Sequence, residues 1–147
     1  METQLHTTTL IEPNELVANL YSLNKNWISD ILFVEDEIKF MREMLERFFE
    51  AQIKDIYVNR VQLVKMQLLS LGFVRKHIYQ NIVRHQENIE QRISNIANKS
   101  DAFLALEDSR LADEMKDLYK AFKKIKNEIF GMVGATLRLE KSPAATC

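Results

Sequence analysis

Three histidines are the residues of this 147-residue chain best suited to chemistry, and their spacing argues against a metal site. Helical di-iron sites use Glu-x-x-His pairs, but none of His6, His77 and His85 has an acid three residues before it. His77 and His85 are also too far apart in sequence to bind one ion as an i, i+4 pair. The chain contains no phosphate-binding glycine loop and no G-x-S-x-G or H-E-x-x-H motif. We therefore expect no enzyme activity, no cofactor and no bound metal.

Two polar residues, Arg75 and His85, occupy positions where the three-four spacing of apolar residues along the chain predicts an apolar side chain. Polar residues at such positions commonly fix the register of packed helices, which is the simpler interpretation of both. The alternative is a small polar pocket inside the fold that binds a small ligand. That pocket would gather Trp27, Asp30, Arg75 and His77.

The elements that carry these residues are predicted from apolar residues at alternating spacings of three and four. Such seams are typical of long helices that pack as in a coiled coil. Two successive steps of four, at Leu23–Trp27–Ile31, predict a stutter in the first seam. The seams are Leu16, Leu20, Leu23, Trp27, Ile31, Val34, Ile38, Met41, Leu45 and Phe48; Val61, Val64, Leu68, Leu71, Arg75, Ile78, Ile82, His85, Ile89, Ile93 and Ile96; and Leu104, Leu111, Met115, Leu118, Phe122, Ile125, Ile129 and Met132.

We expect helices over residues 13–50, 55–98 and 102–139, with Ser100 or Asp101 as the N-cap of the third. The break between the first two helices has no Gly or Pro to mark it. A rival interpretation therefore lets the first helix continue to Leu71 and turn at Gly72, a residue that suits a helix C-terminus.

Charge favours pairing of the first two helices. Residues 12–55 carry ten acids and five bases, whereas residues 56–100 carry two acids and seven bases. Short connections make successive helices antiparallel. The sequence therefore predicts an all-α fold, an antiparallel up-down-up three-helix bundle of long coiled-coil-like helices. A single bundle domain would span residues 13–140, between a disordered arm at 1–12 and a disordered tail at 141–147.

The predicted bundle also sets which residues lie level with one another. His85 would face the interior and hydrogen-bond an acid or amide of a neighbouring helix. It would lie level with residues 113–115 of the third helix and near Asn19 of the first. Arg75 would lie level with Asp30 and, more loosely, with Glu128.

Apolar residues outside the seams predict a surface that a single chain cannot cover. Each such side chain left in water forgoes roughly 1.5–3 kcal/mol of burial. We expect the two sets to form one patch at one end of the bundle, covered by a second copy of the chain, with a dimer favoured. Gly72 would then allow close approach of another backbone. The candidate interface residues are Phe33, Phe40 and Met44 of the first helix and Leu63, Met66 and Phe73 of the second.

Overall composition argues against some classes of partner and indicates a cellular compartment. A formal net charge of -1 argues against general binding to nucleic acid or to membranes. The lone cysteine, Cys147, permits no internal disulfide. No apolar run approaches the roughly 20 residues that span a bilayer, and the first residues do not read as a signal peptide. A cytoplasmic protein is expected.

The run Trp27-x-x-Asp30-x-x-x-x-Glu35-x-Glu37-Ile38-x-Phe40 opens a stretch of the chain that resembles short coiled-coil proteins of unknown function from Bacteroidetes. The resemblance covers residues 27–95 and combines an aromatic start, a loose heptad pattern and a following helix rich in Gln and basic residues. It implies no activity and no functional residues. With the apolar patch, it leads to the hypothesis of a non-enzymatic helical bundle that acts through protein–protein contact as a homo-oligomer.

Overall fold

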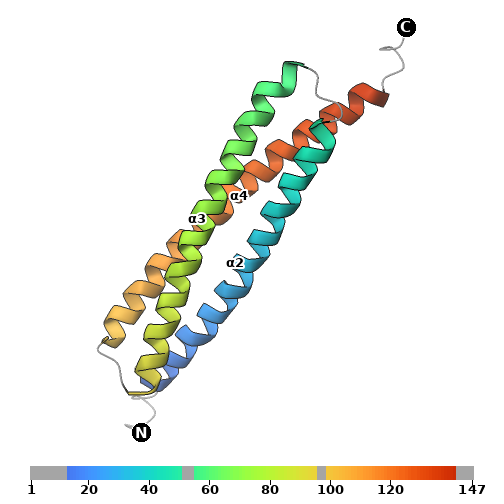
Figure 1. Cartoon of the computed structure of the whole chain (residues 1–147). Helices are drawn as coiled ribbons and strands as arrows, with labels where there is room; N and C mark the ends of the chain where they lie inside the picture. Colours follow the sequence, from blue (N-terminus) through green and yellow to red (C-terminus); the bar gives the residue numbers. More distant parts are fainter. Residues whose placement is uncertain (1–12, 51–54, 96–98, 142–147) are drawn as a thin grey trace. The chain divides into compact units, whose positions relative to one another are not determined.

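The computed structural model of the chain describes residues 13–50, 55–95 and 99–141, and it omits the side chains at some helix ends. Figure 1 shows an all-α, up-down-up three-helix bundle, in which the middle helix runs antiparallel to the other two and all pairs of helices pack together. The predicted fold class is therefore confirmed. The predicted arm at 1–12 and nearly all of the predicted tail lie outside the described residues. The helices are α2 (Pro13–Glu50), α3 (Asp55–Ile93) and α4 (Asp101–Lys141).

The break between the first two helices lies where the seams placed it, because α2 ends at Glu50 and α3 begins at Asp55. The rival turn at Gly72 is wrong, since α3 continues through that residue. The close approach expected at Gly72 is also absent within the described chain, because a Cβ atom built there would meet nothing within 4 Å.

The end of α3 differs from the prediction. The helix stops at Ile93 rather than at residue 98, because Asn95 adopts a left-handed conformation with φ 57°. The Asn95 amide donates to the Arg92 carbonyl at 3.2 Å, and the Ser94 amide donates to the Glu90 carbonyl at 3.0 Å. Asn is one of the few residues other than Gly that ends a helix in this way. The earlier end changes which residues of α3 and α4 lie opposite each other.

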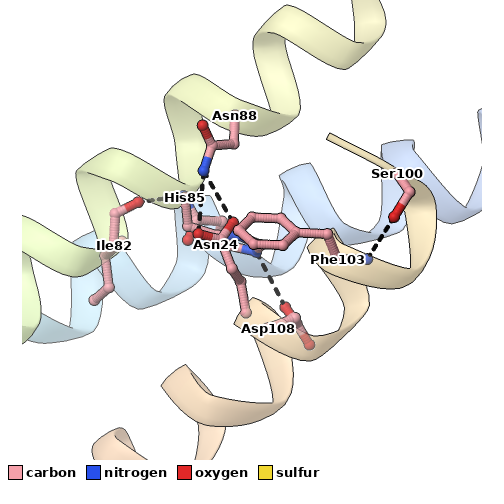
Figure 2. A network of polar contacts seen from close by, with 8 residues as sticks. Asn24, Ile82, His85, Asn88, Ser100, Phe103 and Asp108 are labelled. Atoms are coloured by element: carbon pink, nitrogen blue, oxygen red, sulfur yellow. Dashed lines mark hydrogen bonds and ion pairs between the residues drawn. The ribbon is translucent and has the colours of Figure 1, made fainter. Parts of the chain in front are cut away.

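The start of α4 follows the expected capping chemistry. Ser100 is the N-cap, because its hydroxyl accepts a hydrogen bond from the Phe103 amide at 3.1 Å (Figure 2). Asp101, the other candidate cap, is instead the first residue of the helix. Its carboxylate accepts a hydrogen bond from Arg92 Nε at 2.9 Å, which joins the two helices beside their turn.

Contacts divide the bundle into two compact units, and each contains a segment of all three helices. The first unit holds α2 up to Leu32, α3 from Lys76 onward and α4 up to Lys116. The second unit holds the remaining described parts of the helices. The polar residues discussed below around His85 belong to the first unit, and the exposed apolar residues of α3 belong to the second.

Buried residues recur at strict three-four spacing along α2, which removes the predicted stutter. Asn24 is buried and takes the place in the core that the sequence analysis gave to Leu23, which is exposed. In α3 the same spacing passes through His85, which is fully buried. In α4 the step between Leu104 and Leu111 is filled by Asp108. The buried apolar residues of α2 are Val17, Leu20, Trp27, Ile31, Val34, Ile38, Met41 and Leu45.

Candidate functional site

A cluster of polar side chains lies inside the first unit, where each helix contributes one polar residue at a core position. Asn24 of α2 and His85 of α3 are completely buried. The Asp108 side chain of α4 is only 18% exposed. Figure 2 shows His85 directed toward Asp108 and Asn24 directed toward the backbone carbonyl of Ile82. A residue that is costly to bury therefore stands at a core position of every helix in this unit.

His85 lies between two carboxylates of α4. Its Nδ1 is 2.8 Å from Glu107 Oε1, and its Nε2 is 3.7 Å from Asp108 Oδ1. Burial alone would lower the pKa of His85, but the nearby carboxylates of Asp108 and Glu107 outweigh burial and raise this pKa above its usual 6.5. The geometry thus favours an imidazolium that donates to Glu107 and attracts Asp108. The predicted interior position of His85 and its bond to an acid of a neighbouring helix are confirmed.

Three asparagines complete the cluster. The Asn88 amide donates to both carboxylate oxygens of Glu107, at 3.1 Å each. The Asn81 amide donates to Glu114 Oε2 at 3.3 Å. These bonds all join α3 to α4, so the carboxylates on α4 meet matching donors on α3.

The third asparagine, Asn24, joins α2 to α3. Its amide donates to the backbone carbonyl of Ile82 at 3.2 Å, whereas its own Oδ1 atom is buried without a hydrogen-bond partner in the described chain. His85 Nε2 and Asp108 Oδ1 are likewise buried without hydrogen bonds. The last two atoms attract each other by charge at a distance too long for a hydrogen bond. The arrangement favours one register of the helices at some cost in stability.

The partners of His85 are not those expected from the sequence. Its acidic neighbours are Glu107 and Asp108, whereas the predicted level was residues 113–115. The error follows directly from the early end of α3 at Ile93, which brings earlier residues of α4 opposite each residue of α3.

The polar pocket predicted around Trp27, Asp30, Arg75 and His77 is wrong. Asp30 and His77 are exposed, whereas Trp27 is buried in the hydrophobic core. The Arg75 side chain is 11% exposed and lies 3.6 Å from the Glu35 carboxylate, within the second unit. A seam position alone does not determine whether a polar side chain is buried or exposed to water.

A second candidate site is an apolar surface on α3 in the second unit, called here the α3 apolar face. It consists of Leu63, Met66, Leu69 and Phe73, which are 55%, 68%, 56% and 67% exposed. Met66 stands two residues before buried Leu68, and Phe73 stands two residues after buried Leu71. Because each residue turns a helix by about 100°, both point away from the core. The sequence analysis identified all of these residues except Leu69.

The apolar residues of α2 do not join this face. Glu35 faces α3, as its contact with Arg75 shows. Phe33 and Glu35 flank buried Val34, so they lie about 100° to either side of it. Phe40, seven residues after Phe33, lies on the same flank, away from α3. Phe33 and Phe40 are exposed and Met44 is half-buried. The position of Phe33 and Phe40 on the flank of α2 away from α3 is contrary to the prediction of one combined patch.

Within the described residues, no group of three or more His, Cys, Asp or Glu side chains is arranged to hold a metal ion. No described helix is long and apolar enough to cross a bilayer. No protein-family model, curated protein or solved structure matches the chain. The resemblance to Bacteroidetes coiled-coil proteins therefore stays a prediction from the sequence.

Proposed function

We propose that this protein acts through protein–protein association and that two copies of the chain join through the α3 apolar face. The observation that carries the proposal is the exposure of Met66 and Phe73, at 68% and 67%, on a helix whose opposite side is buried. Two large apolar side chains in water, with two more beside them, favour a partner that removes them from solvent.

The geometry of the bundle explains why the same chain does not cover this face. A helix in a three-helix bundle packs its buried stripe and flanks against two neighbours. Met66 and Phe73 point roughly opposite to buried Leu68 and Leu71, where neither neighbour lies. The described helices therefore leave this face free for a partner.

A second copy suits this face by its apolar surface and by its charge. A two-fold contact sets the same residues of both copies against each other, so an apolar face meets an apolar face. Between Val58 and Tyr79, α3 has no acid and carries Arg60, Lys65, Arg75 and Lys76. In the second unit, α2 offers an excess of acids that the basic side chains of the other copy can approach. The acids of that segment with described side chains are Glu35, Asp36, Glu37, Glu43 and Glu46.

Burial of the α3 apolar face brings the free energy of dimer formation close to balance. Four side chains from each copy leave water, and each contributes roughly 1.5–3 kcal/mol when fully buried. They are already partly covered, so the gross gain is on the order of 10 kcal/mol for the pair. Lost translational and rotational freedom costs about 4–15 kcal/mol, depending on the reference state used. The balance favours a dimer only if additional contacts at the rim contribute, so affinity in the micromolar range is expected rather than tighter.

The experiment replaces both outward-pointing residues by acids. Met66→Glu/Phe73→Glu puts four charges into the proposed interface of a dimer. Light scattering after size exclusion should then give the mass of a monomer, and the helical content, followed by circular dichroism, should be unchanged. A matched control, Ala121→Glu/Asn127→Glu, adds the same charge at exposed positions of α4 and should stay dimeric. If the double variant keeps the mass of the unmodified protein, the α3 apolar face does not carry the association.

A further inference from the structure

A pocket of about 160 Å³ opens between α3 and α4 of the first unit, beside the buried polar cluster. Its size suits several water molecules or one small polar group, but not a drug-sized ligand. The residues that line it are almost all polar: Asn81, Arg84, His85, Glu107, Arg110, Leu111 and Glu114.

The two carboxylates of this pocket are already engaged by donors of the protein. Glu107 accepts from His85 Nδ1 at 2.8 Å and from the Asn88 amide at 3.1 Å. Glu114 accepts from the Asn81 amide at 3.3 Å. The imidazolium form of His85 offsets the charge of Glu107, so this carboxylate has little need of a further cation.

The two arginines of the pocket, unlike its carboxylates, have no partner among the described residues. Arg84 of α3 and Arg110 of α4 are exposed, and neither makes an ion pair or hydrogen bond among the described residues. The two residues belong to different helices, and both line the same small pocket. Two free guanidinium groups at one pocket can bind an oxyanion from two sides, each through a fork of parallel N–H donors.

We propose that this pocket binds a small oxyanion, the carboxylate or phosphate group of a small molecule, held between Arg84 and Arg110. Asn81 and His85 form its inner wall. The site lies in a different unit from the α3 apolar face, so the inference goes beyond the proposed association and does not depend on it. The raised pKa of His85 supports the site, because a protonated ring adds positive charge beside the pocket.

The test is a titration followed by two-dimensional NMR of the backbone amides, with inorganic phosphate and succinate as separate probes in a buffer free of other oxyanions. Saturable shifts are expected at residues 81–85 and 107–114. Saturation by phosphate alone assigns a phosphate group, saturation by succinate alone assigns a carboxylate, and saturation by both assigns oxyanions in general. Shifts that stay linear with both probes, or that spread over the whole chain, overturn the proposal.

Two variants make the assignment specific. Arg84→Ala and Arg110→Ala each remove one guanidinium from an exposed position, so the fold should persist. Each should weaken binding roughly tenfold, the scale of a hydrogen bond to a charged group. Arg60→Ala, an exposed arginine of the same helix in the second unit, is the matched control and should leave the affinity unchanged. Unaltered binding by both pocket variants would also overturn the proposal. Met66→Glu/Phe73→Glu should bind the probe as the parent does, which separates this result from the association.

Discussion

Replacing His85 with leucine removes the ring that lies between the carboxylates of Glu107 and Asp108. The variant leaves Glu107 and Asp108 facing an apolar side chain, although Asn88 still donates to Glu107. Both acidic side chains are 18% exposed, so they reach water only in part. Breaking a buried pair from one side leaves an uncompensated charge, which costs about 3–5 kcal/mol when burial is complete. Because burial here is incomplete, we expect His85→Leu to lose about 2–3 kcal/mol of unfolding free energy in slightly acidic solution.

The loss should depend on pH in a defined direction. The carboxylates of Asp108 and Glu107 outweigh the effect of burial and hold the pKa of His85 above 6.5 in the folded chain. The charged ring therefore contributes its full stabilisation below the pKa of an unfolded histidine, and this contribution is lost as pH rises through the folded-state pKa. The leucine variant lacks this titration. Its deficit should shrink in alkaline solution toward about 1 kcal/mol, the value of a neutral hydrogen bond.

The assay is urea unfolding of both proteins across a pH series, followed by circular dichroism. His77→Leu is the matched control, because His77 is an exposed histidine on the same helix and its loss should cost less than about 0.5 kcal/mol. A deficit of His85→Leu that does not change between about pH 6 and pH 9 would refute the charged-ring account. A variant as stable as the parent in acid would refute the pairing with Glu107 and Asp108 altogether.

Three further substitutions test the local structure by urea unfolding. Gly72→Ala should raise stability by about 0.5–1 kcal/mol, because nothing lies within 4 Å of the new Cβ atom; a loss would mean that a neighbour approaches there. Ser100→Ala should lower stability by about 1 kcal/mol through loss of the bond from the Phe103 amide, and an unchanged value would show that the cap contributes nothing. Asn24→Leu should raise stability by about 1 kcal/mol, because it removes a buried oxygen without a partner; destabilisation would show that the bond to the Ile82 carbonyl outweighs that oxygen.

The helices could be predicted because apolar spacing reports burial directly. The bounds of α2 match the prediction, and those of α4 differ from it by one or two residues. The end of α3 was missed because no Gly or Pro stands there. The signal was Asn95, which tolerates a left-handed conformation. That one boundary then moved the acids opposite His85 from residues 113–115 to Glu107 and Asp108.

The polar cluster could be predicted only in part, because a seam defined by apolar residues does not mark polar residues of the core. His85 stands out since it interrupts an otherwise regular seam. Asn24 does not stand out because apolar Leu23 precedes it, although the three-four spacing continues through Asn24. Asp108 lies within the seven-residue step between Leu104 and Leu111, where the same three-four spacing predicts a further core position. A search for missing heptad positions finds both residues.

Exposure was the harder quantity to predict. Helix periodicity identified Met66 and Phe73 as outward-pointing, and the structure leaves both largely exposed. The side on which Phe33 and Phe40 lie depends on which neighbour occupies which flank of α2, and only the contact of Glu35 with Arg75 fixes that. The handedness of a three-helix arrangement is not encoded in the spacing of one helix, so the prediction placed both sets of residues in one patch.

Sedimentation equilibrium of the unmodified protein at micromolar concentrations tests the central claim most directly, since association through the α3 apolar face requires that the chain be oligomeric. The chain mass is 17.3 kDa, so the account predicts a particle of about twice that mass that dissociates on dilution. A mass of 17.3 kDa throughout the micromolar range would contradict it.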